Sequence, residues 1–154
     1  MRFWRICRRR HAADAARGEG ARLYGGRWNS RGVRVVYAST SLALAAVETF
    51  VTIEPKLRPA DLVSIEGEIP ERLKIGKLDP KTLPRGWHRT RGESLHRFGN
   101  DWIREGQTAA LLVPSAAIQG EWNLLLNPAH RGFPFIRFHD PLPFEFDIRM
   151  FHGP

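Results

Sequence analysis

The stretch Tyr37–Ile53, YASTSLALAAVETFVTI, joins a predicted strand to a predicted helix and holds one charged side chain, the carboxylate of Glu48. Hydroxyl residues at 39–41 are typical helix N-caps, and residues 42–51 are mostly helix formers. On this helix the neighbours of Glu48 are Leu44, Ala45, Val51 and Thr52. A carboxylate without a partner among such groups costs stability. We therefore predict that Glu48 either faces solvent or is retained for chemistry.

Two candidate functional side chains precede Glu48. Tyr37 lies in the run 33–38, VRVVYA, whose β-branched residues on both parities predict a strand covered on both faces. Arg27 lies in the glycine-rich segment 24–32, YGGRWNSRG, within a predicted loop that has one helical turn at residues 12–16. A cation, an aromatic ring and a carboxylate thus follow one another across a turn, a strand and a helix.

The rest of the chain predicts an α+β fold in one domain, residues 1–154. Short β-prone runs predict further strands at residues 3–7, 61–69, 108–115, 135–139 and 143–148, the last two as a terminal hairpin or bend. An amphipathic helix is predicted at 94–105, and a connector at 70–92 contains a short helix at 79–83. Residues 121–128 lead into a loop. The regular βαβ alternation of a doubly wound sheet is missing.

Composition places the chain among folded globular proteins, with 154 residues, 42% hydrophobic and 26% charged. No apolar run approaches the roughly 20 residues that span a bilayer, and no apolar segment of a signal peptide follows the basic start MRFWRICRRR. The single cysteine, Cys7, excludes an internal disulfide and a cysteine-based zinc site. We therefore expect a cytoplasmic protein.

The net charge of +8, from 24 Lys and Arg against 16 Asp and Glu, indicates an anionic ligand or partner. The only dense basic cluster is Arg8–Arg10. Scattered cations favour a small anionic ligand or an acidic protein over a continuous nucleic-acid track. A basic surface that only aids solubility stays an open alternative.

Other common chemistries lack their patterns. The six histidines, at 11, 88, 96, 130, 139 and 152, are never three or four residues apart, so no metal site is predicted. Gly25 and Gly26 are followed by Arg-Trp-Asn rather than by a helix opening, which argues against a phosphate-binding loop. The apolar neighbours of Cys7 favour a packed strand residue over a nucleophile.

Arg27, Tyr37 and Glu48 together have the chemistry needed to break the bond between ribose and nicotinamide in NAD. A guanidinium binds phosphate, an aromatic ring stacks on a flat heterocycle, and a carboxylate stabilises positive charge that develops on a sugar ring. From spacing alone, the alternative stays open that Arg27 is a surface cation, Tyr37 a core residue and Glu48 a solvated helix position.

Several strings of residues resemble the RES domain family, the toxins of bacterial RES–Xre toxin–antitoxin modules. The similarity covers Arg5 to about Ile148, and its strings in chain order are Gly25-Gly-Arg-Trp-Asn29, Gly32, Val36-Tyr-Ala-Ser39, Glu48, Leu111-Leu-Val-Pro-Ser115, Asn123-Leu-Leu-Leu-Asn-Pro128, His130 and Phe133. The family is named for an arginine, a glutamate and a serine, which the similarity places at Arg27, Glu48 and Ser115.

The resemblance implies an ADP-ribosyltransferase-like domain, with a mostly antiparallel split sheet flanked by helices, that consumes NAD without a metal. In that family pattern Arg27 holds the pyrophosphate or the nearby ribose, and Tyr37 lines the nicotinamide pocket. Glu48 stabilises the oxocarbenium-like transition state.

Three further residues are candidates for NAD contacts, each with a structural alternative. Ser115 contacts the nicotinamide amide or ribose, or is a turn residue. Arg5 adds a phosphate contact, or is a strand-edge cation. Asn123 contacts NAD, or, like Asn127, braces the loop after Glu121.

The implied function is that of a toxin of a type II toxin–antitoxin module, acting by glycohydrolysis, phosphorolysis or ADP-ribosyl transfer to a protein acceptor. Its implied partner is an Xre-like helix-turn-helix antitoxin, with nucleic acid contacted only through that antitoxin. One alternative is a basic nucleic-acid-binding or ribonuclease-type toxin that depends on Arg8–Arg10. Another is an inactive domain that only binds its partner.

Overall fold

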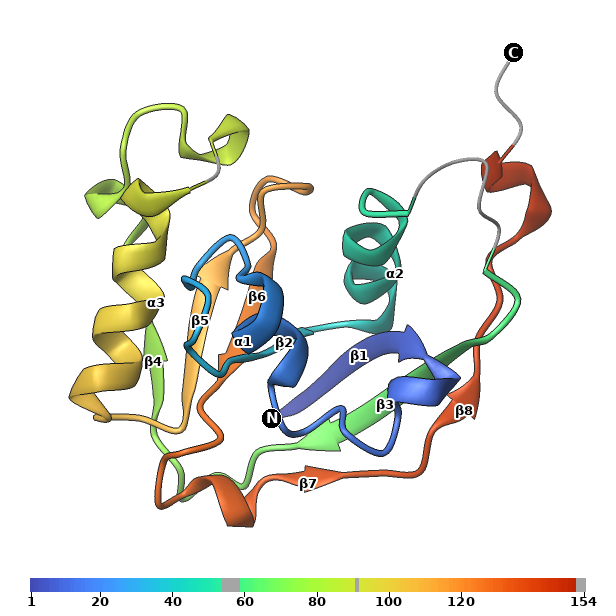
Figure 1. The fold of residues 1–154 in the computed structure, drawn as a ribbon, viewed down its shortest axis with the longest axis horizontal. Helices are drawn as coiled ribbons and strands as arrows, with labels where there is room; N and C mark the ends of the chain where they lie inside the picture. The colour runs from blue at the N-terminus through green and yellow to red at the C-terminus, as the bar shows by residue number, and fades with distance from the viewer. Residues whose placement is uncertain (54–58, 91, 152–154) are drawn as a thin grey trace.

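One sheet joins all the strands that the computed structural model describes in residues 1–53, 59–90 and 92–151 (Figure 1). The strand order is β4-β5-β6-β2-β1-β3-β7, with β8 also beside β3. The strands are β1 (Arg2–Arg8), β2 (Val36–Ser39), β3 (Leu62–Glu68), β4 (Ile75–Lys77), β5 (Ala110–Pro114), β6 (Trp122–Leu126), β7 (Arg137–Phe138) and β8 (Leu142–Pro143). All neighbours pair antiparallel except β4 and β5, which are parallel. The prediction of a mostly antiparallel α+β fold is confirmed.

The sheet is split between β1 and β2. These strands are in register at one residue pair, Trp4 with Ser39, whereas β1 pairs with β3 along its whole length, from Arg2 to Arg8. One half of the sheet therefore contains β4, β5, β6 and β2, and the other contains β1, β3, β7 and β8. The predicted split sheet is confirmed, and the gap in backbone pairing leaves side chains of β1 and β2 to form a site.

Three α-helices of the described residues lie over the sheet: α1 (Glu19–Tyr24), α2 (Leu42–Phe50) and α3 (Glu93–Glu105). Short 3-10 turns complete the described part: η1 (Arg9–His11), η2 (Pro80–Thr82), η3 (Trp87–Arg89), η4 (Phe133–Phe135) and η5 (Ile148–Phe151). Figure 1 shows α3 and α2 on opposite sides of the view, with α1 between them. As predicted, a hydroxyl residue caps α2, because the Ser41 side chain accepts a hydrogen bond from the Leu44 amide at 3.1 Å.

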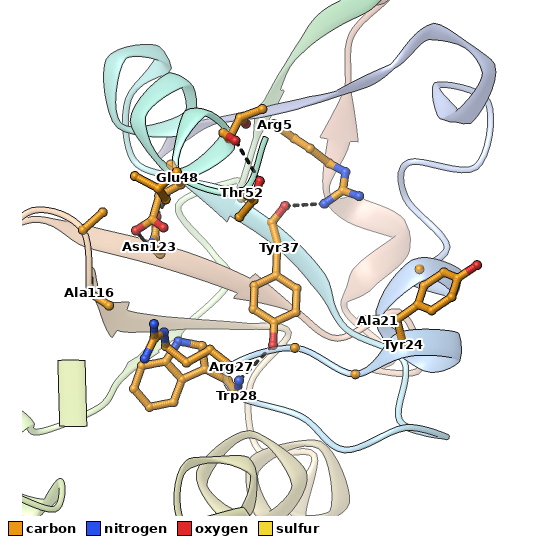
Figure 2. Close-up of a pocket in the computed structure, with 18 of the residues that line it drawn as sticks. Arg5, Ala21, Tyr24, Arg27, Trp28, Tyr37, Glu48, Thr52, Ala116 and Asn123 are labelled. Carbon is orange, nitrogen blue, oxygen red and sulfur yellow. Dashed lines mark hydrogen bonds between the residues drawn. The ribbon is translucent and has the colours of Figure 1, made fainter. Parts of the chain in front are cut away.

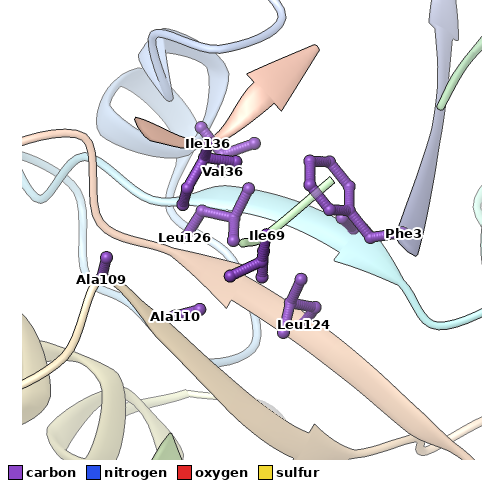
Figure 3. Packing of buried hydrophobic residues seen from close by; sticks show 9 residues of the cluster. Phe3, Val36, Ile69, Ala109, Ala110, Leu124, Leu126 and Ile136 are labelled. Carbon is purple, nitrogen blue, oxygen red and sulfur yellow. The ribbon is translucent and has the colours of Figure 1, made fainter. Parts of the chain in front are cut away.

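Two apolar clusters cover opposite faces of the β5-β6-β2 half of the sheet. Under α3 the cluster contains Trp28, Val35, Leu95, Trp102, Leu111, Val113 and Leu125. The other face packs around Phe3, Val36, Ala38, Leu124 and Leu126 (Figure 3). Neighbouring residues of β2 and β6 thus point into different clusters, as the two-residue period of a strand requires. The strand predicted at 33–38 begins only at Val36, and Arg34 before it is exposed, but from Val36 onward the predicted cover on both faces is confirmed.

Four elements differ from the sequence-based expectation. Helix α1 lies in the segment predicted as loop, β4 lies in the predicted connector, and β6 occupies residues expected to lead into a loop. Of the two alternatives for the terminal strands, the hairpin is wrong and the bend remains, because β7 and β8 both pair with β3 and not with each other. The strand predicted at 143–148 is also wrong beyond its first residue, since β8 ends at Pro143. The prolines between and within these two strands cannot donate backbone hydrogen bonds, and the chain continues along the edge of β3 instead. The short helix predicted at 79–83 is confirmed as η2.

None of the helices in the described ranges combines the length and apolar character needed to cross a bilayer.

Candidate functional site

An open cavity of about 1090 Å³ lies where the sheet is split, between α1, α2 and the first turn of α3. Five of the six site residues proposed from the sequence line this cavity: Arg5, Arg27, Tyr37, Glu48 and Asn123 (Figure 2). The sixth, Ser115, does not. The cavity volume slightly exceeds the roughly 300–1000 Å³ usual for small-molecule sites. Residues from a loop, two strands and a helix are therefore brought together here, as the sequence hypothesis requires.

Glu48 is half-buried on α2, and its carboxylate is held from two other elements. Its Oε1 accepts a hydrogen bond from the Ser115 hydroxyl at 2.6 Å and a second, short one from the Asn123 side-chain amide. The residues near Glu48 in sequence do not pair with it, but distant ones do, so its isolation in the sequence is not an isolation in the fold. Its partners are 67 and 75 residues away in sequence, so the local pattern gave no sign of them.

The other carboxylate oxygen of Glu48, Oε2, accepts no hydrogen bond from any residue that the structure describes, and it is not enclosed by protein atoms. Two donors on Oε1 fix the plane of the carboxylate, which leaves Oε2 for a ligand.

Ser115 lies behind Glu48 rather than in the cavity wall. The residue is 4% exposed and follows the last residue of β5. Its hydroxyl oxygen also accepts hydrogen bonds from the amides of Ala117 and Ile118, at 3.2 and 3.0 Å. Ser115 is thus a turn residue, the alternative weighed from sequence, and its hydroxyl proton points at Glu48. Such a residue positions the carboxylate.

Asn123 on β6 is oriented by a residue that sequence analysis did not assign to the site. The hydroxyl of Ser39, at the end of β2, donates to Asn123 Oδ1 at 2.7 Å. Because that bond occupies the carbonyl oxygen, the amide nitrogen of Asn123 faces Glu48. Asn123 also lines the cavity, so bracing and ligand contact are both within its reach. By contrast, Asn127 is buried and its side chain accepts from the Ala129 amide, as expected for a bracing residue.

Tyr37 crosses the cavity floor from β2 to the glycine-rich loop. Its hydroxyl donates to Asn29 Oδ1 at 2.7 Å and accepts from the Trp28 amide at 3.0 Å. Burial raises the pKa of Tyr37, against the opposing effects of the Trp28 hydrogen bond and the Arg27 charge. The phenol therefore stays protonated, and its hydroxyl remains the donor of the hydrogen bond to Asn29.

The loop at residues 25–29 is closed around that hydroxyl. A Cβ atom at Gly26 would lie 2.4 Å from the Tyr37 hydroxyl oxygen, so only glycine fits. Asn29 is fully buried, and its amide donates to the carbonyls of Ala21, Ser30 and Val33. The string Gly-Gly-Arg-Trp-Asn thus builds a rigid support, and Asn29 is a structural residue that sequence analysis did not single out.

Arg27 projects from this support into the cavity wall. One of its terminal nitrogens donates to the carbonyl oxygens of Thr90 at 2.6 Å and Trp87 at 3.3 Å. Trp87 in turn packs on Trp28, with ring centroids 5.7 Å apart. Arg27 therefore ties residues 87–90, within the connector for which no role was predicted, to the cavity.

Arg5 on β1 fills the gap where β1 and β2 separate. Its guanidinium donates to the backbone carbonyl of Tyr37 at 2.7 Å, and its buried Nε has no hydrogen-bond partner within the described ranges. Burial lowers the pKa of Arg5. An arginine keeps its charge in proteins, so an enclosed guanidinium with an unpaired donor is suited to an anionic ligand.

Within the described ranges, no three His, Cys, Asp or Glu side chains lie close enough together to bind a metal ion. His152, one of the six histidines, lies outside those ranges.

Replacement of Tyr37 by phenylalanine is expected to lower the free energy of unfolding by about 1–3 kcal/mol, because the Trp28 amide and Asn29 oxygen lose their buried partner. Urea denaturation measures the change. Tyr24→Phe is the matched control, since the Tyr24 hydroxyl makes no hydrogen bond to a described residue and its loss should cost less than about 0.5 kcal/mol. Equal losses in the two variants would contradict the anchoring role of Tyr37.

Comparisons with known proteins agree on one family. The model of the RES domain matches residues 2–147. A Sphingobium sp. protein named Prs ADP-ribosylating toxin is 39% identical over 96% of this chain and 95% of its own length. A Yersinia enterocolitica protein named Toxin Res is 36% identical over 97% of this chain and 99% of its own length.

Among solved structures, a chain of the M. tuberculosis MbcT–MbcA toxin–antitoxin complex is similar, with a TM-score of 0.71 and 18% identity. The match covers 94% of this chain and 84% of that chain. At this identity the likeness concerns the fold alone: this chain shares the architecture of that toxin–antitoxin chain.

Proposed function

Because the chain belongs to the RES domain family of toxins, we propose that it consumes NAD by cleaving the bond between nicotinamide and ribose. The observation that carries this proposal is the geometry of Glu48, a half-buried carboxylate with one oxygen fixed by two donors and the other left toward a cavity of about 1090 Å³. No metal takes part in the proposed reaction.

Glu48 acts on the ribose that carries nicotinamide. As the glycosidic bond breaks, its electron pair leaves with nicotinamide and positive charge develops on the ribose ring. The carboxylate stabilises that charge and accepts hydrogen bonds from the ribose hydroxyls. Ser115 and Asn123 keep Oε1 in place, so the carboxylate needs no reorganisation when the charge appears.

The other cavity residues hold the rest of NAD. The guanidinium of Arg5, enclosed and with an unpaired Nε, binds the pyrophosphate. Arg27 contributes positive charge from the opposite wall and keeps the segment around Trp87 in place. Tyr37 presents its ring to the nicotinamide end, while its hydroxyl stays bound to the loop.

ADP-ribose passes to water, phosphate or a side chain of a protein, and the nucleophile loses a proton in that step. The name of the Sphingobium relative describes ADP-ribosylation of Prs, which favours a protein acceptor for this chain as well. The acceptor decides whether the enzyme is a glycohydrolase, a phosphorylase or an ADP-ribosyltransferase.

Nicotinamide release tests the proposal. Purified protein is incubated with NAD alone, with added phosphate, and with an extract of cell proteins, and nicotinamide is measured by chromatography. We expect release in at least one mixture, and the mixture that responds identifies the acceptor. If NAD stays intact in all three, the enzymatic proposal fails.

We also propose an Xre-like antitoxin as partner, with an acidic segment that covers the basic surface around Arg27 and blocks the entry of NAD. The crystal structure that shares the fold is that of a toxin–antitoxin complex. Charge reversal, Arg27→Glu, is expected to weaken antitoxin binding at least tenfold by calorimetry. Unchanged affinity would count against docking at this surface.

The nucleic-acid alternative makes a different prediction. In the cluster Arg8–Arg10, Arg8 forms an ion pair with Asp61, and Arg10 is bonded to its neighbour His11. RNA binding that weakens steeply with salt and depends on this cluster, with NAD left intact, would favour that alternative.

A further inference from the structure

Tyr24, at the end of α1, is an aromatic residue without an evident structural task. Its side chain lines the same cavity as Glu48, yet the residue is 76% exposed. It makes no hydrogen bond or ring contact with another described residue. Burial of an aromatic ring is strongly favourable, so a ring left in water at the mouth of a cavity is a candidate contact for a flat ligand.

The backbone that carries Tyr24 is nevertheless fixed. The carbonyl of Ala21 accepts from the Asn29 side chain and the Gly25 amide, and the carbonyl of Arg22 accepts from the Gly32 amide. Glu19, in the first turn of α1, pairs with Arg22 and with Arg34 beyond the loop. The backbone of Tyr24 is therefore held at a defined place at the cavity mouth, so only the side-chain torsions must be ordered when a ligand binds.

Two glycines flank Tyr24 on the cavity side of the chain. Gly20, one turn earlier on α1, also lines the cavity, and a Cβ atom there would have nothing within 4 Å. Gly25 ends the helix with a φ of 73°, a left-handed conformation that favours glycine. The missing side chain at Gly20 leaves this part of the cavity wall open, and Gly25 lets the chain turn directly after Tyr24.

Figure 2 shows the order of these groups across the cavity. Glu48 and Asn123 lie on one side, Tyr24 lies on the other, and the guanidinium of Arg5 lies between them in this view. The proposed chemistry places the nicotinamide ribose at Glu48 and the pyrophosphate at Arg5. In NAD the adenosine follows the pyrophosphate, so it extends to the side on which Tyr24 lies.

We propose that Tyr24 forms a purine subsite, in which its ring stacks on the adenine of NAD. This inference rests on the proposed function, which sets the orientation of NAD in the cavity. It concerns the adenosine end of the ligand, whereas the proposed reaction takes place at the nicotinamide end. The subsite makes NAD a better substrate than nicotinamide mononucleotide, which lacks the adenosine.

Binding of ADP, which carries a purine and a pyrophosphate but no nicotinamide, tests the subsite without catalysis. Calorimetry should detect ADP binding to the wild-type chain and a loss of affinity of about 10- to 100-fold in Tyr24→Ala. Tyr24→Phe should bind like the wild type, because stacking needs the ring and not the hydroxyl. Leu23→Ala is the matched control, since Leu23 is the exposed neighbour on α1 and does not line the cavity. If Tyr24→Ala binds ADP as the wild type does, or if the wild type does not bind ADP at millimolar concentration, the subsite is refuted.

Kinetics separate this inference from the proposed function. Tyr24→Ala should raise KM for NAD by about tenfold or more, with kcat nearly unchanged, and should leave cleavage of nicotinamide mononucleotide as it is in the wild type. Cleavage of NAD with the same KM in both proteins would overturn the subsite and leave the proposed function intact. Conversely, ADP binding that depends on Tyr24 in a chain that does not cleave NAD would support the subsite and refute the proposed reaction.

Discussion

Glu48→Gln is expected to lower kcat for nicotinamide release by at least about 10³-fold while the protein stays folded. The two side chains have nearly the same size, so packing on α2 is unchanged. What changes is the group that faces the ligand. Because Ser115 and Asn123 both donate to Oε1, the glutamine must place its carbonyl oxygen there.

The amide nitrogen of the glutamine would then point toward the cavity in place of Oε2. A donor with partial positive charge would face a ribose on which positive charge develops, and it cannot accept hydrogen bonds from the ribose hydroxyls. The variant should therefore retain NAD binding and lose catalysis, which appears as a fall in kcat with little change in KM.

Single-turnover release of nicotinamide and calorimetric binding of NAD measure the two effects separately. Glu93→Gln is the matched control, because Glu93 also lines the cavity, from the first turn of α3, and is exposed. That variant should keep its activity to within a few-fold. Equal losses in both variants would mean that the charge of the cavity as a whole matters, and not the position of Glu48.

Sequence analysis named three residues that prove to line one cavity, but it did not predict the hydrogen bonds that connect them to the rest of the chain. Glu48 stands out as the only charged residue of its segment, whereas Tyr37 and Arg27 were selected together with it for their combined chemistry and for the resemblance to a family. The network that fixes Glu48 comes from the ends of β2, β5 and β6, which the chain brings together only through sheet pairing. Hydrogen bonds over such separations leave no local pattern. Only the resemblance to a family pointed to Ser115 and Asn123.

The elements of the fold differ in the same way: those set by neighbouring residues in sequence were predictable, and those set by contacts with distant strands were not. Helix α2 was predictable because its cap and its helix formers are adjacent in sequence. By contrast, β6 lies between β5 and β2 and buries both faces, so its Leu124–Leu126 run has no alternation. Strand β4 has three residues and depends on parallel pairing with β5, which nothing near it in sequence indicates.

Gly99→Ala is expected to destabilise the protein by about 3 kcal/mol or more, although alanine is the better helix former. Gly99 lies within α3, and a Cβ atom there would be 2.0 Å from the carbonyl oxygen of Trp28. This oxygen belongs to the backbone of the loop that carries Arg27, so it cannot turn aside as a side chain would. The helix and the loop must separate, which weakens the apolar cluster between them.

Separation of α3 from the loop would also break the hydrogen bonds between Asn100 and Ser30. Asn100 accepts from the Ser30 amide at 3.1 Å and donates to the Ser30 hydroxyl at 2.8 Å, and both bonds need the close approach of α3 to the loop. Urea denaturation of Gly99→Ala measures the cost, with Gly20→Ala on α1 as the matched control. A Cβ atom at Gly20 meets nothing within 4 Å, so that variant should be neutral or up to about 1 kcal/mol more stable.

These outcomes decide what keeps the loop at residues 25–29 in place. Tyr37 anchors it from β2 through two hydrogen bonds, and Gly99 lets α3 press on it from the other side. If the loop is clamped between the two, Gly99→Ala should reduce nicotinamide release even under conditions where the variant is fully folded, because Arg27 moves with Trp28. A folded variant with wild-type activity would indicate that the anchor at Tyr37 suffices and that the contact with α3 serves stability alone.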